Sequence, residues 1–165
     1  MASVSMYARA AVVAGISGNI AISVYLAITL PLFFHTKPEL LFQWDASNIV
    51  GNSAYAGGIG SALLGFLFDC IVSICWAAIF AAVYETFAPV RRMPALSGVV
   101  FGLIVMAVML ELVVPLGHAQ QASRAAPALL NTAVAHTVFF GLPVALVIAA
   151  LLRRTVGPLP DELTP

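Results

Sequence analysis

The sequence predicts an all-α integral membrane protein built as a four-helix bundle. Of its 165 residues, 62% are hydrophobic and 8% are charged, whereas soluble domains have about 45–50% and about 25%. The apolar residues form four stretches, each long enough to cross a bilayer core of about 30 Å. Seven basic and seven acidic residues cancel, so no basic field exists to attract nucleic acid. We expect one membrane domain without a nucleic-acid partner.

The four predicted spans cover residues 10–34, 61–84, 95–114 and 128–152, within a single domain of residues 1–154. The first stretch follows Arg9, as the apolar core of a secretory signal follows a basic residue. It is too long for a signal, and no small-x-small cleavage site follows it. We therefore expect a helix that is retained in the membrane.

The segment between the first two spans allows three interpretations. Residues 45–60 form a short surface helix, a re-entrant segment, or an outward extension of the second span, and the extension is favoured. Trp44 suits an interfacial position, and Asp45 or Ser47 suits the cap of a helix that starts there. At the other end of the chain, the Pro-rich residues 155–165 predict an extended tail.

The basic residues predict the orientation. Five of them, Arg9, Arg91, Arg92, Arg153 and Arg154, fall on one side of the predicted bundle. Only Lys37 and Arg124 fall on the other side. By the positive-inside rule both termini, and with them the tail, lie in the cytoplasm.

Each span carries a stripe of small residues, which in membranes usually marks a face of helix contact. The stripes are Ala11, Gly15, Asn19 and Ser23; Gly57, Ser61 and Gly65; Gly98 and Gly102; and Ala133, Thr137, Gly141, Ala145 and Ala149. They predict either a compact bundle alone or association between copies. Cys70 and Cys75 are five residues apart on different faces of one helix, so we interpret both as small hydrophobes.

Polar side chains in the outer half of the bundle are the candidate site. Ionisable groups within a membrane are costly and mark pathways or binding sites. The candidates are Asp69, Glu111, His136 and Asn131. Asp69 shares a helix face with the small-residue stripe and is expected to point inward, as is His136, whereas the direction of Glu111 is open.

Three interpretations of this cluster remain. The side chains are hydrogen-bonded glue between helices, or they bind a proton, a cation or a polar head group from the periplasmic side, or they ligate haem or a metal. The histidines available as ligands are His35, His118 and His136, and the first two are the best pair for haem. No HxxxH, HExxH or ExxH spacing supports a metal, and no catalytic motif is present.

Several short runs resemble a family. They are the residues from Trp44 to Ser47, Gly51, the stretch from Ala54 to Gly58, the run from Leu63 to Gly65, the run from Val114 to Leu116, the segment from Leu130 to His136, and the run from Gly141 to Pro143. Together they are similar to small four-helix bacterial inner-membrane proteins of unassigned function, of the YagU type. The resemblance implies a multi-pass protein of that membrane and supplies no activity. Such proteins carry a histidine near the position of Asp69, and its absence here argues against a role for two intramembrane histidines.

These observations predict an accessory or structural subunit of a larger membrane complex with a periplasm-facing intramembrane pocket. One alternative is an oligomeric proton- or cation-linked transporter or channel. Another is a haem- or quinone-associated electron-transfer subunit. The expected partners are membrane lipid, including bound lipid, and either other membrane subunits or further copies of the chain. No cofactor is expected unless the haem alternative holds.

Overall fold

The computed structural model describes residues 4–153, and these are helical apart from short joints. Four helices are long and apolar enough to cross a membrane, and they cover Val4–Phe34, Gly58–Thr86, Pro94–Leu116 and Ala126–Leu152. Each contains one of the predicted stretches, so the all-α, four-span fold class is confirmed. The tail predicted over residues 155–165 lies outside the described residues.

The first two spans are the single helices α1 (Val4–Phe34) and α3 (Gly58–Thr86). The third consists of α5 (Pro94–Val108), the π-helical turn η2 (Met109–Val113) and α6 (Val114–Leu116). The fourth consists of α7 (Ala126–Val134), the π-helical segment η3 (Ala135–Gly141) and α8 (Leu142–Leu152). A π-helical turn is wider than an α-helical one and is found frequently at functional sites.

The joint between the first two spans is a separate helix, α2 (Pro38–Val50), followed by the 3₁₀ turn η1 (Gly51–Ala56). The favoured extension of the second span was therefore wrong. The chain turns before α2 at His35, where φ is 54°, and after it at Gly51, where φ is 65°. Neither of the predicted caps starts a helix, because α2 begins earlier at Pro38, a residue suited to the first helical position.

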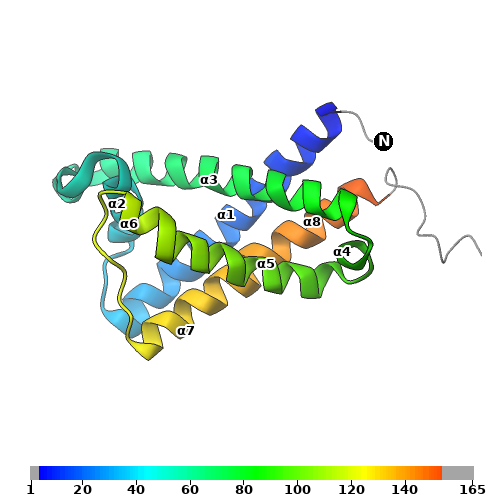
Figure 1. The fold of residues 1–165 in the computed structure, drawn as a ribbon. Helices are drawn as coiled ribbons and strands as arrows, with labels where there is room; N and C mark the ends of the chain where they lie inside the picture. The colour runs from blue at the N-terminus through cyan, green and yellow to red at the C-terminus, as the bar shows by residue number, and fades with distance from the viewer. Residues whose placement is uncertain (1–3, 154–165) are drawn as a thin grey trace, which may run out of the picture.

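The two ends of the bundle differ, as Figure 1 shows. One end, called the α2 end below, holds α2, α6 and the loop of residues 117–125. The other, the α4 end, holds α4 (Ala88–Arg92), the start of α1 and the end of α8. The functional candidates lie toward the α2 end.

Small residues allow the helices to touch through their backbones. A Cβ atom added to Gly15 would lie 2.6 Å from a Cα atom of α3, and one added to Gly98 would lie 2.6 Å from the carbonyl oxygen of Gly141. At Gly102, on α5, an added Cβ would overlap the carbonyl of His136 in η3. The prediction that the small-residue stripes mark contact faces is therefore confirmed. Toward the α4 end, large buried side chains fill the core between the helices, including Phe80, Tyr84, Ile148 and Leu152.

Candidate functional site

A cavity of about 480 Å³ lies at the α2 end, between α1, α2, α3 and those parts of the third and fourth spans that are nearest to this end. Most of its wall is apolar, including Ile22, Leu26, Leu30, Met109, Leu110 and Val114. Pockets for small molecules typically measure about 300–1,000 Å³ and combine apolar walls with a few convergent polar groups. The cavity has that size and composition.

Asp69 enters the cavity from α3 and is held by Asn19 of α1. The Asn19 amide is fully buried, and its Nδ2 donates to Oδ2 of Asp69 at 2.6 Å. The same nitrogen lies 3.5 Å from Oγ of Ser73, and the thiol of Cys70 donates to Oδ1 of Asn19 at 3.5 Å. Asn19 therefore fixes one oxygen of a carboxyl group whose side chain lines the cavity.

Asp45 reaches the same cavity from α2. The two helices touch where a Cβ on Gly65 would overlap the carbonyl of Phe42 and lie 2.8 Å from the amide nitrogen of Ala46. Asp45 stands between those two α2 residues, and Asp69 is one helical turn beyond Gly65, so this contact brings the two carboxyl groups together. Burial, reinforced by the charge of Asp69, raises the pKa of Asp45 well above its ordinary value.

The fourth span contributes an imidazole and an amide. Nδ1 of His136 lies 2.9 Å from the carbonyl oxygen of Thr132, and because a carbonyl only accepts, Nδ1 donates and the neutral ring keeps Nε2 as an acceptor. Oη of Tyr25 donates to Oδ1 of Asn131 at 2.8 Å. The Tyr25 ring stacks on Phe139 with centroids 4.2 Å apart, which positions that hydroxyl.

The structure thus brings together three of the residues predicted for the pocket, Asp69, Asn131 and His136. Two further residues of the site were not predicted from the sequence. Asn19 was assigned only to a packing stripe, although an amide among glycines and alanines in a membrane helix is itself a polar signal. Asp45 was interpreted as a helix cap, whereas the sequence Lys37-Pro38-Glu39 is typical of a helix start and would have placed Asp45 inside the helix.

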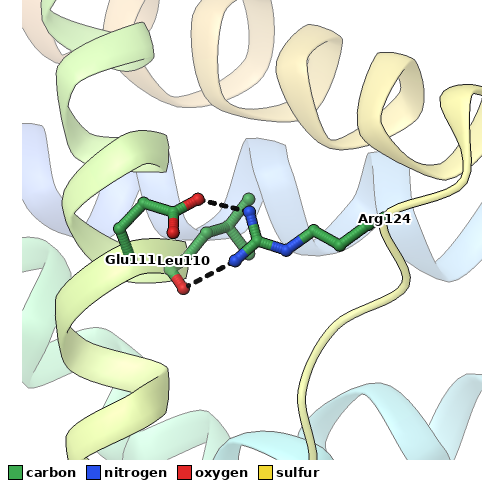
Figure 2. A network of polar contacts seen from close by, with 3 residues as sticks. All are labelled: Leu110, Glu111 and Arg124. Atoms are coloured by element: carbon green, nitrogen blue, oxygen red, sulfur yellow. Dashed lines mark hydrogen bonds and ion pairs between the residues drawn. The ribbon is translucent and has the colours of Figure 1, made fainter.

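Glu111 was predicted as a fourth pocket residue, and the structure places it elsewhere. Its side chain is 64% exposed and forms an ion pair with Arg124 of the 117–125 loop (Figure 2). Leu110 and Val114, one turn apart, face the cavity. Glu111 follows Leu110 around the helix and therefore projects away from it, and it is not part of the cavity wall.

The loop of residues 117–125 closes one side of the cavity. Residues 120–123 belong to the cavity wall, and the indole Nε1 of Trp44 donates to the carbonyl oxygen of Gln120 at 2.9 Å. Arg124 attaches the end of the loop through Glu111 and through the carbonyl oxygen of Leu110, at 3.2 Å from Nη2. The loop is thus tied to α2 and to the third span.

The two histidines of the predicted haem pair lie near opposite ends of α2 and outside the cavity wall. His35 lies at the joint before α2, whereas the amide of His118 donates to the carbonyl of Asn48 near the other end of α2. With 1.5 Å per residue, the intervening part of α2 is about 15 Å long. Within residues 4–153, no three or more His, Cys, Asp or Glu side chains gather as a metal site.

Comparison with protein-family models, with curated proteins and with solved structures finds no match for this chain. The resemblance to the YagU type therefore stays a prediction.

Proposed function

We propose that this four-span membrane protein binds a cation in its cavity in exchange for a proton. This is the activity that a proton- or cation-linked transporter or channel, one of the alternatives predicted from the sequence, requires. The observation that carries the proposal is that Asp45 and Asp69, from two different helices, line one mostly apolar cavity. Ionising both carboxyl groups in such surroundings is costly, because each loses hydration and repels the other. One of them therefore keeps a proton until a cation replaces it.

The arrangement favours this role over helix-to-helix glue. A polar residue that serves only as glue is satisfied by its neighbours, and Asp69 is partly so through Asn19. Asp45 lines the same cavity from a different helix, α2. His136 lines the same space. With Nδ1 donating to Thr132, its Nε2 is the nitrogen that can take up a proton and pass it on.

The distribution of basic residues supports an orientation for this site. Arg9, Arg91, Arg92 and Arg153 belong to the α4 end, and Lys37 and Arg124 to the α2 end. Under the positive-inside rule the α4 end is cytoplasmic. We place the chain in a bacterial inner membrane with the cavity on the periplasmic side.

Two other roles have less support from the geometry. The subunit role depends most on the tail at 155–165, which lies outside the described residues. The haem form of the electron-transfer role needs two axial histidines, and His35 and His118 lie near opposite ends of α2, outside the cavity wall. The cation-binding role is supported directly by the two carboxyl-bearing residues of the cavity wall, Asp45 and Asp69.

The test is proton release on cation addition. Purified protein in lipid nanodiscs, in weakly buffered solution with a pH indicator, is mixed with sodium, potassium or alkylammonium chloride. We expect about one proton released per protein, because a bound cation lowers the proton affinity of the carboxyl pair. Asp45→Asn and Asp69→Asn should each abolish the release, and Glu39→Gln is the matched control, since Glu39 is an exposed carboxylate on α2 outside the cavity wall.

Asn is a near-isosteric, neutral replacement, so both variants should stay folded. If Asp69 acts only as glue, Asp69→Asn should cost about 1 kcal/mol or less of stability and leave proton release intact. Undiminished release from a protein carrying both Asp69→Asn and His136→Gln would show that this pair has no part in the exchange. Undiminished release from the Asp45→Asn, Asp69→Asn double variant would refute the proposal.

A further inference from the structure

We infer that the ligand of the cavity is an amphipathic organic ammonium ion, an apolar body that carries one primary or secondary amine. The inference rests on the proposed cation exchange and specifies the class of cation. It follows from the size of the cavity, from its wall and from the kind of polar group that it presents.

The size argues against a bare inorganic ion. A cavity of about 480 Å³ holds a small organic molecule, and a single metal ion would leave most of it empty. Inorganic cations also require several ligands, six to eight oxygens in the case of Ca²⁺. The part of the chain that the structure describes offers no cluster of three or more His, Cys, Asp or Glu for this purpose.

The wall suits an apolar body next to a positive charge. Leu26, Leu30 and Met109 line the cavity with aliphatic surface, while the aromatic rings of Trp44 and Tyr55 also border it. Aliphatic chains are stabilised by burial against such surface, and aromatic faces attract cations. A hydrated inorganic ion would leave this apolar wall without a partner.

The polar groups of the cavity select the charge and the hydrogen-bonding pattern of the ligand. The carboxyl groups of Asp45 and Asp69 and the Nε2 atom of His136 are acceptors. None of the Lys and Arg residues between 4 and 153 borders the cavity, and Arg124 is engaged outside it. A protonated amine supplies the positive charge and the N–H donors that these acceptors lack.

The hydrogen-bonding pattern also separates a protonated amine from a quaternary ammonium. A trimethylammonium group carries the charge but no N–H donor, so it would leave buried acceptors unpaired, at a cost in affinity. A neutral alcohol with the same alkyl chain as the amine supplies an O–H donor but no positive charge. A carboxylate with the same alkyl chain would be repelled by the negative charges of the two aspartates.

The experiment measures equilibrium binding of octylamine, which is protonated at neutral pH, to the full-length protein in nanodiscs. Octyltrimethylammonium, octanol and octanoate serve as the comparison series. We expect octylammonium to bind at least tenfold more tightly than each of the other three. Asp69→Asn should weaken its binding at least tenfold, and Glu39→Gln should leave it unchanged. The ligand series on the unaltered protein tests the inference even if a variant fails to fold.

Three outcomes overturn the inference, and they are distinguishable. Equal binding of octanol and octylammonium would indicate simple apolar partitioning. Proton release by sodium or potassium without octylammonium binding would refute the ligand class and leave the proposed cation exchange standing. Absence of proton release with every cation would refute both.

Discussion

The contact between α2 and α3 gives a sharp test of how the site is assembled. In Gly65→Ala the added methyl group meets the backbone of α2, since it would overlap the carbonyl of Phe42 and approach the amide of Ala46. Overpacking costs about 1–3 kcal/mol, and we expect the upper limit because backbone atoms cannot turn aside. Alanine regains about 1 kcal/mol of helix propensity over glycine. The net loss is therefore about 2 kcal/mol.

Gly60→Ala is the matched control, because it lies on the same helix and an added Cβ there has no atom within 4 Å. It should be neutral or stabilise α3 by up to about 1 kcal/mol. The assay is unfolding in mixed micelles of increasing SDS content, followed by the fluorescence of the two tryptophans, Trp44 on α2 and Trp76 on α3. If the free energies of unfolding of Gly65→Ala and Gly60→Ala agree within about 0.5 kcal/mol, the helices do not touch as described.

Three further predictions concern charge. Because the pKa of Asp45 is raised, the folded protein keeps a proton that the unfolded chain has lost. The thermal stability of the protein without ligand should therefore fall as pH rises through the raised pKa of Asp45. Asp45→Asn should remove this decline. Arg124→Gln breaks the exposed pair with Glu111. Amide exchange in the 117–125 loop should accelerate while the thermal midpoint stays unchanged, and a large midpoint shift would show that the pair contributes more than an exposed ion pair does. Reporter fusions after Arg92 should be cytoplasmic and those at Gln121 periplasmic, and the reverse result would invert the proposed orientation.

The spans were predictable because a bilayer imposes a length and a composition that can be counted along the sequence. Helix α2 was not, since its 13 residues include Gln43, Asp45 and Asn48 and carry no membrane-spanning signal. The π-helical segments η2 and η3 were also missed. Each segment ends two residues before a proline, Pro115 or Pro143, which cannot donate to the helical hydrogen-bond ladder. A proline alone does not predict a π-helical segment, because Pro31 lies within the continuous helix α1.

The site was predictable as far as helix faces could be followed. Asp69 is four residues from Gly65, so the small-residue stripe gave its direction correctly. Glu111 lies outside the cavity wall. Its direction was open because the stripe of the third span, Gly98 and Gly102, ends more than two turns before residue 111. Asp45 could join the site only once α2 was known to fold back against α3, a tertiary contact that no local pattern encodes.

The position of α2 in the chain also determines when the site forms during synthesis. At 13 residues and 1.5 Å per residue, α2 is about 20 Å long, too short to cross a bilayer core of about 30 Å. It leaves the ribosome before α3, the helix on which it packs, and before the third and fourth spans that complete the cavity. The carboxyl pair can therefore assemble only once α3 has been synthesised, and the cavity around it only once the third and fourth spans have been inserted. A chain arrested after α3 has the pair but lacks the rest of the cavity wall.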